Sequence, residues 1–286
     1  MEKYYKQSDL KKIQNLELNI LKQFICFCDK HKLTYFLIAG SALGAVRHKG
    51  FIPWDDDLDI GMPRKDYEKF LTIAETELTD KYHIINAEKY DTYPLLTTQL
   101  ALKETRFVVE NFKTLNIPFG IYLDIFPFDD MCDNNKKAVK HARKTWFWGK
   151  VQILSCIPRP YVSFKGFQRS CIWVVTTSAY YFLKLLHIHP NRLYKKTKQL
   201  SVRFNGQNNK RINFFCDTNC LSNMIKLKEL YPLKKGEFEG VEVNLPNKVE
   251  AHLTRLYGDY MVMPPVEKRK NHYPYVLDFG EYDGKE

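Results

Sequence analysis

The chain of 286 residues is 44% hydrophobic and 14% aromatic, which excludes a disordered protein and suffices for the core of one large domain. Its net charge of +11 at pH 7 favours an anionic partner. The first seven residues contain no apolar run, so we expect no secretory signal, a cytoplasmic location and seven reduced cysteines.

The spacing of apolar residues predicts an α/β (α+β) fold. Residues 8–30 follow a Ser-Asp helix start and place apolar side chains at helical spacing. The later predicted elements are strands at 35–39, 57–63, 95–102 and 120–126, and helices at 40–48 and 64–77. Pro127 is expected to close the last of these strands. Because repeats and low-complexity linkers are absent, we expect a single domain over residues 1–286.

Four aspartates stand within five residues, Asp55, Asp56, Asp57 and Asp59. Neighbouring carboxylates repel each other, so we expect a divalent cation to hold them together. In a strand alternate side chains share a face, which brings Asp57 and Asp59 together and turns Asp56 away. Asp55 has the same parity but follows a Pro-Trp bend, so its part in metal binding stays open. Ligands that are all oxygen favour Mg²⁺ or Mn²⁺; a solvated acidic turn is the alternative.

Two further features complete a candidate phosphotransfer site. Gly40 and Ser41, between a strand and a helix, are typical of a phosphate cradle, although a plain turn explains them as well. Arg47 and His48, at the far end of that helix, either neutralise phosphate charge or belong to the surface. Asp124 lies among apolar residues, where a lone acid is costly to bury, and is the third carboxylate that such chemistry needs. A structural aspartate is the alternative.

Residues 131–216 form a basic, aromatic-rich insertion with 17 Lys and Arg and one acid. Within it residues 171–188 place apolar side chains on one helical stripe, flanked by basic residues. The stretch is short for a membrane span, and we expect residues 165–200 to contact an anionic membrane peripherally. An ordinary buried helix is the alternative. Cys216 and Cys220, with His187 or His189, leave a zinc site open as a minor alternative.

Several of these motifs resemble the LicD family, which belongs to the nucleotidyltransferase-fold superfamily and includes the fukutin-related proteins. The resemblance is most specific at residues 36–48 and 50–60, which include the Gly-Ser pair and Trp-Asp-Asp-Asp-Leu-Asp. It continues in residues 64–67, 123–127, 257–260 and 264–269, and at His272. The insertion contributes no recognisable motif.

The resemblance implies a nucleotidyltransferase-like mixed sheet with flanking helices. It also implies a transferase that moves phosphocholine, or a related phospho-alcohol, from CDP-choline or another CDP-alcohol to a glycan hydroxyl. Lipopolysaccharide, teichoic acid, capsule or a lipid-linked precursor would be the acceptor, and the enzyme would be cytoplasmic or peripheral on the inner face of the plasma membrane.

The same resemblance implies roles for individual residues. Asp57, Asp59 and Asp124 would be catalytic metal ligands, with Asp55 open as another ligand. Gly40 and Ser41 would meet the donor diphosphate. Arg269 and His272 lie in a family block whose chemical role the sequence does not reveal.

Two other functions remain open from the sequence. A nucleotidyltransferase of the same fold would use a nucleoside triphosphate and release pyrophosphate. A nucleic-acid-binding protein would use the basic insertion on phosphates. That second interpretation leaves the aspartates unexplained, so nucleic acid is not the favoured partner.

Overall fold

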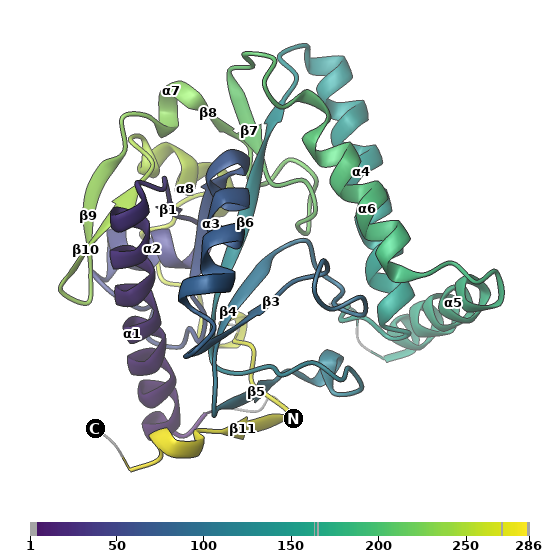
Figure 1. The fold of residues 1–286 in the computed structure, drawn as a ribbon, viewed down its shortest axis with the longest axis horizontal. Helices are drawn as coiled ribbons and strands as arrows, with labels where there is room; N and C mark the ends of the chain where they lie inside the picture. The colour runs from purple at the N-terminus through teal and green to yellow at the C-terminus, as the bar shows by residue number, and fades with distance from the viewer. Residues whose placement is uncertain (1–4, 163, 165, 270, 285–286) are drawn as a thin grey trace.

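Apolar strands of the chain assemble into one mixed sheet with helices on either side (Figure 1). The computed structural model describes residues 5–162, 164, 166–269 and 271–284. The central strands lie in the order β1-β2-β6-β4-β3, and β7 pairs with the far end of β6 and with β8. Strand β2 runs parallel to β6, whereas the other neighbours in this sheet are antiparallel. The α/β class expected from the sequence is confirmed.

The strands are short except for β6, which runs through the centre of the sheet. Two further antiparallel pairs, β9 with β10 and β5 with β11, lie outside it. The bounds are β1 Phe36–Leu37, β2 Asp59–Pro63, β3 Tyr82–Ile85, β4 Thr98–Leu102, β5 Arg106–Val108, β6 Tyr122–Met131, β7 Arg211–Asn213, β8 Ile225–Lys226, β9 Lys234–Phe238, β10 Val241–Leu245 and β11 Val276–Asp278.

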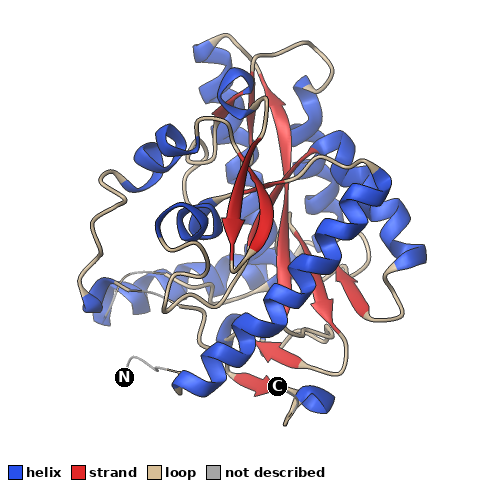
Figure 2. Cartoon of the chain, turned by 90° about the vertical axis from the view of Figure 1, so that its left-hand side faces the viewer, coloured by secondary structure: helices blue, strands red, loops and turns tan. Residues whose placement is uncertain are grey.

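Helices cover the sheet from several sides. The long helix α1 and the β9–β10 hairpin lie on the left of Figure 1 and face the viewer in Figure 2. The helices are α1 Gln7–His31, α2 Ala39–Arg47, α3 Arg64–Glu77, α4 Asn135–Cys156, α5 Gly166–Leu185, α6 Pro190–Ser201, α7 Leu227–Leu230 and α8 Val249–Tyr257. Short 3-10 turns are η1 Glu110–Phe112, η2 Val202–Phe204, η3 Val266–Lys268 and η4 Gly280–Tyr282.

Several strand boundaries differ from the sequence-based prediction. Strand β1 ends early because Ala39, with φ of 46°, already turns the chain into α2. Strand β2 therefore begins only at Asp59, since β1 has no residues left to pair with the aspartates before it. Strand β4 begins at Thr98, three residues later than expected.

Pro127 does not close β6, which continues to Met131. The amide of Asp124 donates to Leu58 O on the β2 side. Because successive N–H groups of a strand point to alternate sides, the N–H groups of the odd-numbered residues of β6 point toward the side of β4 and β7. On that side pairing with β4 ends at Ile125, and pairing with β7 starts at Asp129. Pro127 lies in the gap between them, where its missing N–H costs no ladder bond.

Gly61 allows β2 to lie under a layer of aromatic rings. A Cβ atom on this residue would come within 2.6 Å of the Phe36 ring and 2.9 Å of the Phe128 ring. These two rings pack edge to face at 5.2 Å between centroids. Because Gly61 has no side chain, the rings of Phe36 on β1 and Phe128 on β6 can pack directly over the backbone of β2.

The basic insertion is helical. Helices α4, α5 and α6 leave the sheet after β6 and return to it at β7, on the right of Figure 1. Among the described residues no single helix is long and apolar enough to cross a membrane. Helix α5 and the stretch from Pro190 to Phe204 pass that test only as a pair, bent by 103°.

A buried ion pair fixes α3 to the far end of β6. The Arg64 guanidinium donates from Nε and Nη2 to the two oxygens of Asp129, at 2.8 and 2.7 Å. Asn205 also donates to Asp129, at 2.8 Å. This contact holds the start of α3, directly after β2, against the strand that carries Asp124.

We expect Asp129→Ala to lower the free energy of unfolding by about 3 kcal/mol, because the Arg64 guanidinium loses its bidentate buried partner and keeps only the more exposed Glu68. Urea denaturation measures the change. Glu242→Ala, which breaks the exposed pair with Lys235, is the matched control and is expected to cost less than about 1 kcal/mol. Equal losses in the two variants would contradict the structural role given to the Arg64–Asp129 pair.

Candidate active site

Asp59 and Asp124 face each other across the parallel pair β2 and β6. They are direct register partners, so their side chains leave the same face of the sheet from strands about 4.8 Å apart. Burial, and next the charge of Asp57, raise the pKa of Asp124 to about 7. Thr97 and Gln99 hydrogen-bond to this carboxylate, and its Oδ1 has no partner among the described residues. The pair therefore presents two half-buried carboxylates at one point, and one of them has an oxygen without a partner among the described residues.

The loop before β2 adds Asp55 and Asp57 to this pair. Burial raises the pKa of both carboxyl groups, and their mutual repulsion raises that of Asp55 further. The backbone oxygen of Asp55 is held by the Gln14 side chain of α1, at 2.9 Å. Four acids thus converge at this point.

Gly40 and Ser41 lie against the acidic loop. A Cβ atom on Gly40 would come within 2.8 Å of Asp55 Oδ2, so only glycine lets this carboxylate lie over the start of α2. The Ser41 hydroxyl accepts a hydrogen bond from the Asp59 amide at 2.7 Å. The Gly-Ser pair therefore positions the aspartates directly; its contact with a donor phosphate stays a prediction.

Asp56 corrects one sequence-based prediction. Strand parity predicts that it faces away, yet one of its oxygens lies within 4.8 Å of a ligand atom of Asp57, and the residue is fully buried. Its oxygens accept the His272 amide, at 2.9 Å each, and the Tyr5 hydroxyl, at 2.5 Å. Asp56 thus connects the acidic loop to the residue before α1 and to the C-terminal segment.

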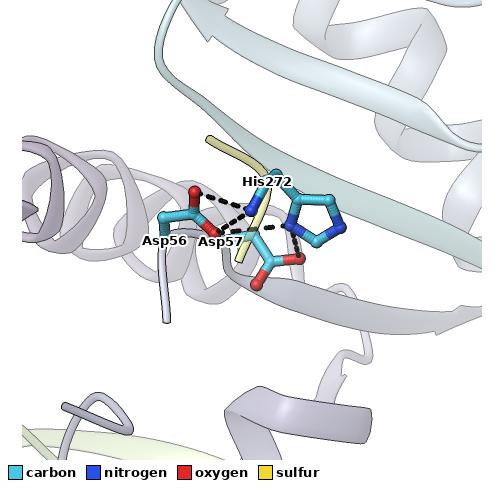
Figure 3. Close-up of side chains that lie close together, drawn as sticks. All are labelled: Asp56, Asp57 and His272. Atoms are coloured by element: carbon cyan, nitrogen blue, oxygen red, sulfur yellow. Dashed lines mark hydrogen bonds and ion pairs between the residues drawn. The ribbon is translucent and has the colours of Figure 1, made fainter. Parts of the chain in front are cut away.

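His272 brings positive charge to the cluster (Figure 3). Its Nδ1 lies 3.4 Å from both Asp56 Oδ1 and Asp57 Oδ2. The nearby Asp57 charge, more than any other group, raises the pKa of His272 to about 10, so the ring is protonated at neutral pH. Asp56, Asp57 and His272 are also close enough to hold a metal ion, with ligand atoms within 4.8 Å of one another. The structure therefore places His272 at the acidic cluster, whereas the sequence assigned it no chemical role.

Arg269 lies on the other flank of the acidic loop. Its guanidinium stacks over the Trp54 ring at 4.3 Å, next to Asp55 in the chain. Tyr257 is also close, because Asp59, Asp55 and Asp57 all contribute to raising the pKa of its hydroxyl. The C-terminal family block thus supplies a cation and an aromatic ring beside the aspartates.

Arg47 and His48 lie at the opposite end of α2 from Gly40. Arg47 is seven positions further along α2 than Gly40, which corresponds to a rise of about 10 Å along the helix. Arg47 donates to His48 Nε2 at 2.9 Å and to Tyr260 O at 2.6 Å. In the structure Arg47 therefore holds the C-terminal segment to α2, and a phosphate contact for these two residues stays a prediction.

Glu17 is an acidic residue of the site that the sequence did not reveal. It lies on α1, is 1% exposed, and its Oε2 has no partner among the described residues. Burial raises its pKa, and the charges of Asp57, Asp56 and the neighbouring aspartates raise it further. A buried Glu within an apolar helical stripe was the signal, since such a residue is costly without a partner.

The donor set fits a hard divalent cation. The carboxylates raise one another's pKa, and buried oxygens of Asp124 and Glu17 have no partner among the described residues. Each of these costs disappears when a cation neutralises the group. Oxygen ligands of this kind suit Mg²⁺ or Mn²⁺. Among the described residues the closely spaced ligand group contains neither Cys216 nor Cys220, so the structure gives the zinc alternative no support.

The chain is similar in sequence to several known proteins. The family model described as LicD/FKTN/FKRP, nucleotidyltransferase domain, matches residues 32–171. An uncharacterised protein of Rickettsia typhi is 50% identical over 44 residues, which are 15% of this chain and 14% of that protein. An uncharacterised protein of Rickettsia prowazekii is 54% identical over 37 residues, 13% of this chain and 14% of that protein.

A longer match covers almost the whole chain. The lipopolysaccharide cholinephosphotransferase LicD of Haemophilus influenzae is 30% identical over 276 residues, which are 94% of this chain and 97% of the relative. The match extends through the aspartate loop, the insertion and most of the C-terminal block, well beyond the family model. The chain therefore belongs to the LicD family, and the LicD-like transferase expected from its motifs is confirmed.

Proposed function

We propose that this chain transfers phosphocholine, or a related phospho-alcohol, from a CDP-linked donor to a hydroxyl of a cell-surface glycan or its lipid-linked precursor, with Mg²⁺ or Mn²⁺ bound. The observation that carries the proposal is the meeting of Asp57, Asp59 and Asp124 in one half-buried acidic group, in which nearby charges raise the pKa values of Asp59 and Asp124. The long match to a lipopolysaccharide cholinephosphotransferase supports phosphocholine as the transferred group.

Asp124 is placed to hold and move a proton. Its Oδ1 is not committed to another group among the described residues, so it can accept a proton from a bound hydroxyl. In the proposed reaction the acceptor hydroxyl gives its proton to Asp124, the hydroxyl oxygen bonds to the phosphorus of the transferred phospho-alcohol, and the bond from that phosphorus to CMP breaks. Gln99, opposite Asp124 on β4, orients the carboxylate.

Asp57, Asp59 and Asp124 would hold the divalent cation, with Asp55 next to them. When bound, such an ion offsets the charge of the donor diphosphate and of the leaving CMP. Burial of the carboxylates excludes water and strengthens these interactions.

Positive and aromatic groups beside the aspartates fit the rest of the donor. Gly40 and Ser41, at the start of α2, would meet the diphosphate, and Arg269 would contribute charge from the C-terminal block. The Trp54 ring already binds one cation, the Arg269 guanidinium. The same ring face would suit the quaternary ammonium of choline.

A nucleotidyltransferase reaction is the second candidate, because the matching family model is described as a nucleotidyltransferase domain. It would consume CTP and release pyrophosphate, whereas the proposed reaction consumes CDP-choline and releases CMP. Incubating the purified protein with each donor and a lipid-linked oligosaccharide, and analysing the products, separates the two functions. Pyrophosphate from CTP without CMP from any CDP-alcohol would favour the second.

We expect Asp59→Asn and Asp124→Asn each to lower CMP release from CDP-choline by at least about a hundredfold. Each change also removes one of several repelling charges, so melting temperature in EDTA should stay equal or rise. Asp56→Asn is the control: it weakens the anchor to Tyr5 and His272 and should lower the melting temperature instead. Normal turnover by the Asp59 and Asp124 variants would overturn the assignment.

The raised pKa values of the acidic site should make its contribution to the stability of the metal-free protein less favourable as pH rises from about 4 toward 8. The folded-state pKa values of Asp55, Asp59, Glu17 and Asp124 lie above their unfolded values, so their contribution is complete at low pH and is lost as pH passes the folded value, about 7 for Asp124.

The stabilisation by Mg²⁺, measured as the melting temperature with Mg²⁺ minus that with EDTA, should therefore be larger at about pH 8 than at about pH 5.5. Asp59→Asn should reduce this difference at the higher pH. A difference that does not change with pH would show that Mg²⁺ does not bind these carboxylates.

A further inference from the structure

Helix α5 presents an apolar face to solvent. None of its residues is buried, although it contains eleven aliphatic and aromatic side chains between Phe167 and Leu185. Its other face rests on the chain before it, where Trp173 Nε1 donates to Pro160 O and Thr177 Oγ1 to Pro158 O. The ordinary buried helix considered from the sequence is therefore wrong.

The exposed apolar side chains of α5 follow one another at helical spacing. We call this set the outward face; its members are Phe167, Val174, Val175, Tyr181, Phe182 and Leu185, each between 59% and 83% exposed. The sequence-based stripe was only partly right, because Ile172, Ala179 and Leu183 are half-buried on the inner side. A soluble surface rarely carries an apolar stripe of this length without a partner.

Basic side chains surround the outward face. The Arg159 and Arg169 guanidinium groups stack on the Trp173 ring, at 5.8 and 5.0 Å, and Lys184 lies 4.7 Å from the Tyr180 ring centre. The next helix exposes Arg192, Lys195 and Lys196. The sequence from 134 to 216 contains no acidic residue. The occupant of this surface must therefore be both apolar and anionic.

A groove of about 550 Å³ along α5 combines the same chemistry. Its lining brings together the Arg159 guanidinium, the hydroxyls of Ser170, Thr177 and Ser178, and the side chains of Trp173, Val174 and Tyr181. A cation with nearby hydroxyls suits a phosphate headgroup, and the apolar part suits the beginning of an acyl chain.

We propose that the outward face of α5 docks this protein on an anionic phospholipid bilayer. The helix lies at the edge of the molecule, beyond α4 and α6, where a flat surface can reach it (Figure 1). A second copy of the chain is the poorer occupant, because it would bring two strongly basic segments together. Docking is independent of the chemistry proposed above, since α5 contributes no residue to the acidic cluster.

Vesicle flotation of the full chain tests the proposal. We expect binding to phosphatidylcholine vesicles that contain about 30% phosphatidylglycerol, little binding to pure phosphatidylcholine, and weaker binding at high salt. Val174→Ser/Val175→Ser/Phe182→Ser removes apolar area, and Arg159→Glu/Arg169→Glu reverses charge. Each combination should lower the partition coefficient at least about tenfold.

Lys11→Glu/Lys22→Glu on α1 is the matched control, since both lysines are exposed and the charge change is the same. It should bind vesicles within about twofold of the unchanged protein. Circular dichroism checks that every variant is folded. The proposal is overturned if vesicles do not bind at low salt, if the control loses as much as the arginine variant, or if the serine variant separates a dimer without changing vesicle binding.

Discussion

The parallel pairing of β2 with β6 is the constraint on which the rest of the site depends. It places Asp59 and Asp124 in direct register, on one face of the sheet. Both residues are half-buried, and nearby charges act more strongly on such groups than on acids in water. Burial is the largest cause of the raised pKa of both; the charge of Asp57 adds to both, and that of Asp124 adds to Asp59.

Elements far apart in the chain hold this unfavourable arrangement together. Helix α1 supplies Gln14 for the backbone of the acidic loop, and Gly40 leaves room for a carboxylate above α2. The C-terminal segment crosses the loop and donates the His272 amide to Asp56. Asp56 is thus structural. Asp55, Asp57 and Asp59 remain available to bind a cation, which would relieve the repulsion between them.

Local sequence patterns predicted the bounds of α1 and α3 closely, because apolar residues recur at helical spacing in both segments. They also identified Asp57, Asp59 and Asp124 as neighbours, Asp124 from the cost of a lone acid among apolar residues. The strand parity assumed for Asp57 was wrong, because this residue lies in the loop before β2. Local patterns could not show that Pro127 lies inside a strand, which depends on a gap between two other strands. Glu17, the burial of Asp56 and the place of His272 depend on contacts across 40 residues or more, and local patterns carry no information on them.

The position of the bound cation tests this account most directly. Crystals grown with Mn²⁺ and CDP-choline can be measured at the manganese absorption edge, where anomalous scattering locates the ion. The account predicts a manganese peak bounded by Asp57, Asp59 and Asp124, with the donor diphosphate against it. Manganese bound only between Asp56 and His272, or absent from the aspartates while the donor is bound, would contradict it.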